Sequence, residues 1–229
     1  MINSHSPQDV AFSEFRPIRL AIKKDSSHIG IVFKVEAGGL NRLIHLGFHH
    51  QLHCQELAVI PNWISSYAWL DLAGFSDGEL LQIAVWIETI WNVNGTNVPY
   101  GIAYSGSGYF DYTTGRFIQS QTGKGLTCAT FVMAVFEDFQ LPLLDWNTWN
   151  YRDTDQGFLN HIVGCLDDAV AAGNADAMHV QSQKNALGIA PRFRPSEVAV
   201  AGGAYLGEPI PFVTAELLSR HLQVDLNNL

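Results

Sequence analysis

One cysteine stands where a helix is expected to begin, and its surroundings suit nucleophilic chemistry. Cys128 follows Gly125 and Thr127 and opens the run 128–139, whose apolar residues recur at helical spacing. Thr127 is a suitable N-cap. The free N–H groups and the dipole at a helix start stabilise a thiolate, so this position predicts a lowered Cys128 pKa and an oxyanion site. The alternative is a buried cysteine that serves as a small apolar residue.

Two histidines could activate such a thiol. His28 opens the β-branched run 28–35, and His45 lies in the run 42–48, so both are expected on neighbouring strands of one hairpin. An imidazole beside a thiol is the usual base, and its second ring nitrogen needs an orienting partner. We therefore predict Cys128 as the nucleophile, His28 as its base and His45 as the group that orients His28. The alternative is that each histidine is simply hydrogen-bonded within its strand.

Three segments of the chain resemble the NlpC family of papain-like cysteine peptidases, namely residues 27–32, 43–45 and 125–132. They are similar to the family's catalytic-histidine strand, to the following strand with the third polar catalytic residue, and to the helix that begins with cysteine. Residues 98–101 are similar to its tyrosine-bearing segment, whose tyrosine lines the active site; here it is Tyr100. Thr127 stands where the usual members have Asp or Asn.

The order of these segments resembles a circularly permuted branch of the family, because both histidine segments precede the cysteine. That branch includes relatives of lecithin:retinol acyltransferase, and the resemblance covers residues 20–140. It implies an α+β, papain-like fold with a small antiparallel sheet packed on the Cys128 helix. A single domain, 1–229, is expected, with a core at 16–140 and helical or extended C-terminal elaborations at 141–229.

The resemblance also implies a reaction. It is hydrolysis of an amide bond, of the cell-wall peptide type, or acyl transfer through a thioester in the permuted relatives, without a cofactor. A small peptide or amide is the expected substrate, and Tyr100 and Thr127 are expected beside the Cys128 N–H at the oxyanion. A non-catalytic binding module on the same fold is the remaining alternative.

The elements that must position these residues are indicated by hydrophobic periodicity and by turn residues. The capping-box pair Ser76 and Glu79 marks the start of one helix. Shorter strand-like pieces are expected at 100–104 and 116–119, and the proline-rich region 191–211 is expected to wrap around the domain. The expected strands are 16–23, 28–35, 42–48 and 51–60, and the expected helices are 80–91, 128–139, 155–172, 175–187 and 214–221.

Other groups that could carry chemistry receive plainer interpretations. A histidine and cysteine cluster could recruit a transition metal, but no acidic ligand stands at a recognisable spacing and HEXXH is absent, so no metal is expected. Cys165 is expected to be inert core. Four aspartates are expected as solvated charges and two tryptophans as packing residues. The histidine and cysteine cluster consists of His49, His50, His53 and Cys54. The four aspartates are Asp153, Asp155, Asp167 and Asp168, and the two tryptophans are Trp146 and Trp149.

The overall composition is that of an ordinary globular protein, with 47% hydrophobic and 15% charged residues. The formal net charge of −9 disfavours nucleic acid and anionic membranes as partners. Three widely separated cysteines predict reduced thiols. No apolar run is long enough to span a bilayer, and residues 1–13 lack the features of a secretory signal. A cytoplasmic location is therefore expected, with export by a signal-independent route left open.

Overall fold

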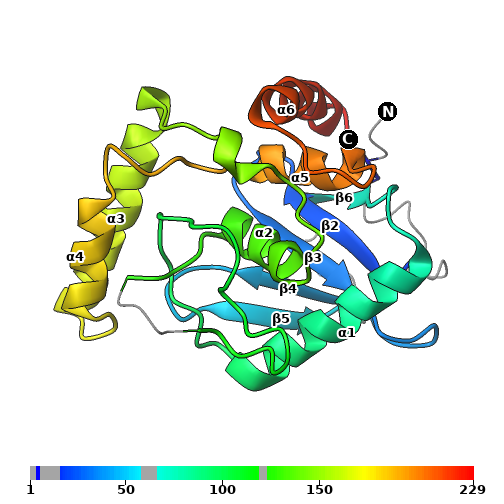
Figure 1. Ribbon diagram of the computed structural model, residues 1–229, viewed down its shortest axis with the longest axis horizontal. Coiled ribbons are helices and arrows are strands. Elements are labelled where there is room, and N and C mark those ends of the chain that lie inside the picture. Colours follow the sequence, from blue (N-terminus) through cyan, green and yellow to red (C-terminus); the bar gives the residue numbers. More distant parts are fainter. Residues whose placement is uncertain (1–3, 6–15, 58–65, 119–122) are drawn as a thin grey trace.

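An antiparallel sheet forms the centre of the computed structural model, which describes residues 4–5, 16–57, 66–118 and 123–229. Six strands lie in the order β1-β6-β2-β3-β4-β5, and each neighbouring pair is antiparallel (Figure 1). The strands are β1 (Ser4–His5), β2 (Ile18–Lys23), β3 (Ile29–Phe33), β4 (Arg42–Leu46), β5 (Leu52–Glu56) and β6 (Tyr67–Asp71).

The two faces of the sheet follow from the alternation of side chains along each strand. Leu20 of β2, Ile31 of β3 and Ile44 of β4 belong to the main core, beneath the helices. The residues between them, such as Ala21 and Val32, form a second apolar cluster on the opposite face. Both faces are therefore buried along the central strands β2 and β3.

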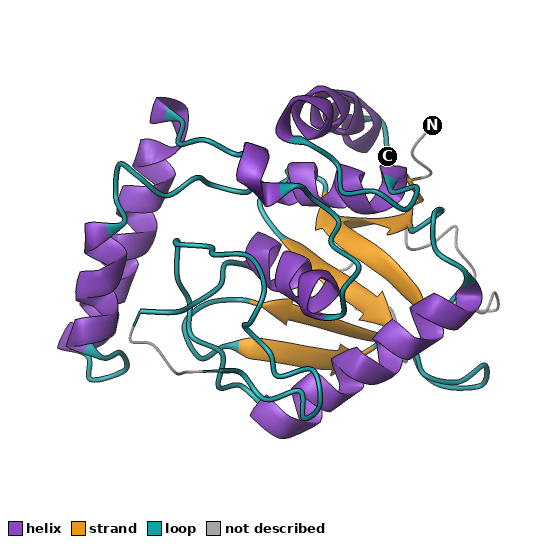
Figure 2. Cartoon of the chain, in the orientation of Figure 1, coloured by secondary structure: helices purple, strands orange, loops and turns teal. Residues whose placement is uncertain are grey.

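Helices cover one face of this sheet. α2 packs on β3 and β4, α5 packs on β2 and β6, and α1 packs on β2 (Figures 1 and 2). α3 and α4 lie side by side at one end of the molecule, and α6 packs on α5. The helices are α1 (Asp77–Asn94), α2 (Cys128–Asp138), α3 (Gln156–Ala171), α4 (Ala177–Asn185), α5 (Pro195–Ala204) and α6 (Phe212–Asn227). The protein is thus an α+β protein with an antiparallel sheet.

Several predicted elements differ from the structure. The strand expected at 51–60 is only Leu52–Glu56, and the last three positions lie outside the described residues. The pieces expected at 100–104 and 116–119 form only isolated bridges in their described residues. The helix expected at 214–221 extends over Phe212–Asn227, because Leu222 and Leu226 continue its buried face. Neither β6 nor α5 was predicted.

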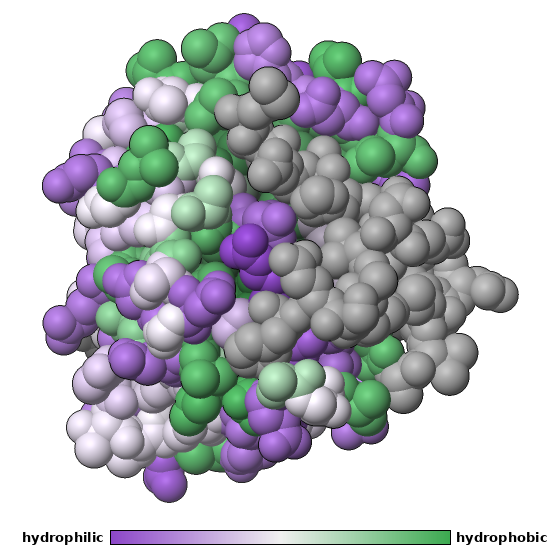
Figure 3. Space-filling view, turned by 90° about the vertical axis from the view of Figure 1, so that its right-hand side faces the viewer, coloured by the Kyte–Doolittle hydropathy of each residue, from purple (hydrophilic) through white to green (hydrophobic). Residues whose placement is uncertain are grey.

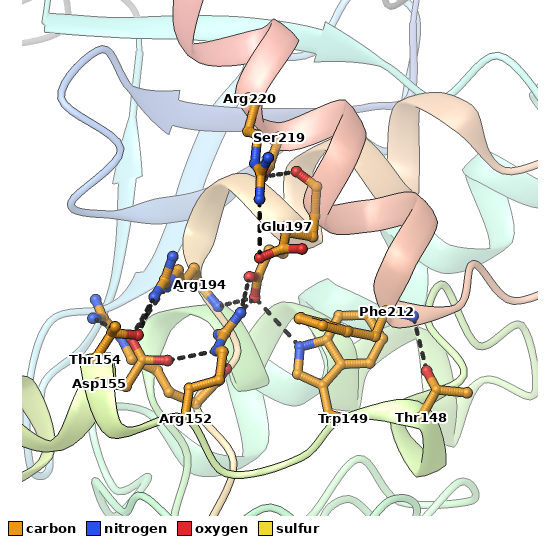
Figure 4. A network of polar contacts seen from close by, with 12 residues as sticks. Thr148, Trp149, Arg152, Thr154, Asp155, Arg194, Glu197, Phe212, Ser219 and Arg220 are labelled. Carbon is orange, nitrogen blue, oxygen red and sulfur yellow. Dashed lines mark hydrogen bonds and ion pairs between the residues drawn. The ribbon is translucent and has the colours of Figure 1, made fainter.

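An ion-pair network joins α3 to α5 (Figure 4). Asp155 was predicted to be solvated, but it is fully buried and accepts hydrogen bonds from three arginines: Arg152 at 2.7 Å, Arg192 at 3.2 Å and Arg194 at 2.9 Å. Arg152 also bonds Glu197, which is fully buried too. The expectation for Asp155 is wrong because two of its three arginine partners, Arg192 and Arg194, lie 37 and 39 positions further along the chain.

The surface carries few large apolar side chains. Val213, Leu217 and Val224 are exposed along α6, at the top of the molecule, where Figure 3 shows hydrophobic residues among hydrophilic ones. Within the described ranges, no helix is long and apolar enough to cross a membrane.

Candidate active site

Cys128 is the first residue of α2, and Thr127 is its N-cap, as the sequence predicts. The Thr127 hydroxyl accepts the Thr130 N–H at 3.2 Å, and the Thr130 hydroxyl accepts the Thr127 N–H at 2.7 Å. This reciprocal capping box satisfies two N–H groups of the helix start. The Thr127 hydroxyl is therefore used to fix the start of α2, and with it the position of Cys128.

The thiol of Cys128 is enclosed, with 7% of the residue exposed. Burial raises its pKa above the ordinary value, while the backbone N–H groups of Ile29 and Ala129 and the charge of Arg192 act in the opposite direction. The lowered pKa predicted from the helix start is thus wrong in direction. Loss of solvation around the sulfur outweighs the N–H groups, so the resting side chain is a neutral thiol.

His28 and His45 form a hydrogen-bonded pair. His28 Nε2 lies 2.9 Å from His45 Nδ1, and the two rings meet edge to face. Burial lowers the pKa of His28 to about 4 and that of His45 to about 3, so both rings are neutral near pH 7. Gly30 makes room for this pair, because a Cβ on Gly30 would lie 2.8 Å from the Cβ of His45.

The cysteine and the histidine pair meet at the start of β3. His45 alternates with Ile44 along β4 and therefore lies on the sheet face opposite α2. Cys128 stands at the end of α2, where its sulfur receives the N–H of Ile29, the first residue of β3. His28 directly precedes Ile29 and so lies at the same end of β3, but among the described residues no hydrogen bond joins its ring to the Cys128 sulfur, and the predicted pairing of nucleophile and base stays a prediction.

Tyr100 is another neighbour of Cys128. The N–H of Cys128 reaches its hydroxyl oxygen, and burial raises the pKa of Tyr100 well above its ordinary value. Its backbone forms a parallel bridge to Leu126. Gly125 permits this close approach, because a Cβ there would lie 2.7 Å from the Tyr100 carbonyl carbon. Tyr100 is thus adjacent to the start of α2.

Tyr67 is a site residue that the sequence analysis missed. It opens β6, and its ring lies edge-on to His28 with the ring centroids 6.5 Å apart. Burial and then the nearby Cys128 raise its pKa to about 12, so its hydroxyl keeps its proton. An aromatic residue that opens a strand was the available signal, but the strand itself was not predicted.

The residues of the histidine and cysteine cluster are spread over β5 and the turn that precedes it. His45 pairs with His53 across β4 and β5, whereas His49 and His50 lie in the turn between these strands. Cys54 is half-buried in β5, and burial raises its pKa to about 11. Among the residues that the structure describes, no group of three His, Cys, Asp or Glu side chains could hold a metal ion.

Two further expectations are settled by burial. Cys165 was expected in the core, but it is only half-buried on α3, with His161 Nε2 3.7 Å from its sulfur. It lies at the edge of the stripe that contains the buried residues Ile162 and Leu166. Trp149 is a packing residue, as expected, since it is 5% exposed and donates to Glu197.

The buried histidines predict a stability that depends on pH. The pKa values of His28, His45 and His49 are lowered from 6.5 to about 4, 3 and 4, mainly by burial. Between these values and 6.5 the unfolded chain binds more protons than the folded one. The stability that neutral histidines contribute is therefore present above pH 6.5 and is lost as the pH falls towards 4.

Urea unfolding at pH 7.0, 6.0 and 5.0 measures this effect. The midpoint should fall at each step, and the fall should be smaller in a His49→Asn variant, which removes one of the three groups. His161→Gln, a change at an exposed histidine, serves as the control and should leave the slope unchanged. Equal midpoints at pH 7.0 and 5.0 would show that these rings are not buried in neutral form.

Comparisons with models of known protein families, with curated proteins and with solved structures give no match.

Proposed function

We propose that this protein is a thiol hydrolase that cleaves an amide bond through Cys128 and His28. The observation that carries the proposal is the meeting of three features at the start of β3: the Cys128 sulfur on the Ile29 N–H, the neighbouring His28, and the 2.9 Å bond from His28 to His45. A buried thiol and a buried, oriented and neutral imidazole at the same end of one strand are the two groups that general-base activation requires.

The proton transfer follows from the neutral state of both groups. When His28 Nε2 donates to His45 Nδ1, the lone pair of His28 is at Nδ1. In the proposed mechanism this nitrogen accepts the Cys128 proton when the substrate-bound site brings the ring and the thiol into contact. Cys128 then attacks the carbonyl carbon as its proton moves to His28, and His28 returns that proton to the leaving amine. Water, activated by the same ring, releases the acyl group from the thioester. His45 acts by holding the ring of His28.

The negative charge of the tetrahedral intermediate needs donors. The N–H of Cys128 lies at the helix start, where the dipole of α2 favours negative charge. The hydroxyl of Tyr100 is in contact with this N–H and keeps its proton because of its raised pKa. In the proposed mechanism both groups donate to the developing oxyanion.

A second candidate function has one observation in its favour. The enclosed Cys128 thiol with its raised pKa also suits a module that binds a ligand on this fold without turning it over. Acyl transfer to an amine instead of water uses the same thioester. The experiment below distinguishes all three possibilities.

Acetylation by p-nitrophenyl acetate tests the proposal. Rapid mixing at pH 7.5 should give a burst of nitrophenol equal to the enzyme concentration, and mass spectrometry should locate the acetyl group on Cys128. A His28→Ala variant should lower the burst rate by roughly 10²- to 10⁴-fold, the range in which a general base contributes. His221→Ala, a change at an exposed histidine on α6, should leave it unchanged.

The fate of the acetyl group then identifies the reaction. Decay to free acetate indicates a hydrolase, whereas formation of an acetyl amide with added glycinamide indicates a transferase. Peptidyl aminocoumarin amides show whether amides are cleaved as well as esters. No acetylation of Cys128 in the wild-type protein would contradict the proposal and favour the binding module.

A further inference from the structure

Two buried histidines hold the backbone of Tyr100 from opposite sides. The N–H of Tyr100 donates to His49 Nδ1 at 3.1 Å, and His179 Nε2 donates to the Tyr100 carbonyl oxygen at 2.8 Å. Each histidine is 7% exposed. His49 comes from the turn between β4 and β5, and His179 comes from α4, so residues far apart in the sequence converge on the backbone of one residue.

The neighbouring contacts restrain the same segment. Gln183, one turn after His179 on α4, is fully buried and accepts the Ile102 N–H at 2.7 Å. The Leu126 N–H donates to the Pro99 carbonyl at 3.0 Å. The segment that carries Tyr100 is therefore tied on one side to α4 and on the other to the residues just before Cys128.

We propose that His49 and His179 are positioning residues, an inference that rests on the proposed function. They hold the Tyr100 backbone so that its hydroxyl stays at the Cys128 N–H, where the substrate carbonyl oxygen acquires its charge. This assigns a role to α4, which lies outside the region of family resemblance: it completes the oxyanion side of the site from the C-terminal part of the chain.

The chemistry of the two rings fits this role. His49 must be unprotonated at Nδ1 to accept an N–H, and it lies beside two other imidazoles, His50 and His179, at ring-centroid distances of 4.1 and 5.0 Å. Burial lowers the pKa of His49, and repulsion from His50 and His179 when these rings are charged lowers it further, so His49 is neutral near pH 7. Near pH 7 the ring is thus an acceptor, and it could not be replaced by a residue that only donates.

The test compares two reactions of the full-length protein. Alkylation of Cys128 by iodoacetamide develops no oxyanion, whereas acetylation by p-nitrophenyl acetate does. In His179→Leu, which fills the space without a donor, acetylation should fall roughly 10- to 100-fold, as expected when a catalytic group shifts by up to about 1 Å. Alkylation should keep its wild-type rate. Both reactions are followed at Cys128 by mass spectrometry.

Conservative variants provide the matched comparison. His179→Gln can place an amide N–H near the position of Nε2 and should restore most of the acetylation rate lost in His179→Leu. His49→Asn can place a carbonyl oxygen near Nδ1 and should keep most of the wild-type rate. His50→Asn is the control, because His50 has a positive φ of 53° that asparagine tolerates, and it should behave as wild type.

Each of the following results would overturn the inference. If His179→Leu acetylates at the wild-type rate, α4 does not position the oxyanion side. If alkylation and acetylation fall together, or if His179→Gln fails to restore the rate lost in His179→Leu, the residue has a general structural role. A wild-type protein that is not acetylated at all contradicts the proposed function itself, which separates the two failures.

Discussion

A Cys128→Ala variant is expected to lose the burst of acetylation by more than roughly 10⁴-fold, since removal of the nucleophile in hydrolases of this general mechanism has effects of that size. The change should not unfold the protein. It removes one buried sulfur atom, which costs on the order of 1 kcal/mol. The thermal midpoint, measured on the same sample, checks that the loss is chemical.

The other thiols provide the control for this experiment. Cys165 is half-buried and has a histidine nitrogen, His161 Nε2, 3.7 Å from its sulfur, so it is the thiol best placed to react in place of Cys128. A protein with Cys54→Ala and Cys165→Ala should therefore keep the full burst. Acetylation that persists in Cys128→Ala at the wild-type rate, or that is located on Cys165, would exclude Cys128 as the nucleophile.

An Asp155→Ala variant is expected to have the largest effect on stability. Asp155 is fully buried and neutralises part of the charge of Arg152, Arg192 and Arg194. Removal of one partner of a buried ion pair leaves uncompensated charge and costs about 3–5 kcal/mol. The free energy of unfolding, from urea titration at pH 7, measures the loss. If Asp155→Ala does not fold, Asp155→Asn should fold and lose a smaller part of the stability.

A surface ion pair provides the matched control. Asp167 lies 2.7 Å from Lys184, with 45% and 41% of these side chains exposed. Exposed pairs contribute about 0–1 kcal/mol, because solvent screens the charges and both side chains lose freedom. Asp167→Ala should therefore change the free energy of unfolding very little. Equal losses in Asp155→Ala and Asp167→Ala would mean that burial of Asp155 has no energetic consequence.

The part of the site that could be predicted is the part built from local sequence. His28 directly precedes β3 and His45 lies on the adjacent strand β4, because the two strand-forming runs 28–35 and 42–48 are joined by a turn. The two rings are hydrogen-bonded. The Thr127 cap and the start of α2 could likewise be read from a few neighbouring residues. The catalytic roles of these residues stay predictions until the acetylation experiments are done.

The remaining residues of the site depend on contacts over long sequence separations. Tyr67 reaches His28 through the pairing of β6 with β2, and His179 reaches Tyr100 from 79 positions away. No local pattern specifies such pairings. The direction of the Cys128 pKa could not be predicted for a related reason, because the helix start is visible in the sequence whereas the burial that opposes it is not.

The hydrogen bonds that link His49 and His179 to the Tyr100 backbone have a consequence for the order in which the site is assembled during synthesis. His28 and His45 are 17 positions apart and can pair as soon as their hairpin has left the ribosome. The thiol of Cys128 follows much later, and the hydrogen bond from His179 to Tyr100 cannot form until α4 has emerged. A nascent chain therefore contains its proposed base long before it contains the residues that are proposed to stabilise a tetrahedral intermediate. The contact between His179 and Tyr100 thus makes acyl chemistry depend on the synthesis of α4.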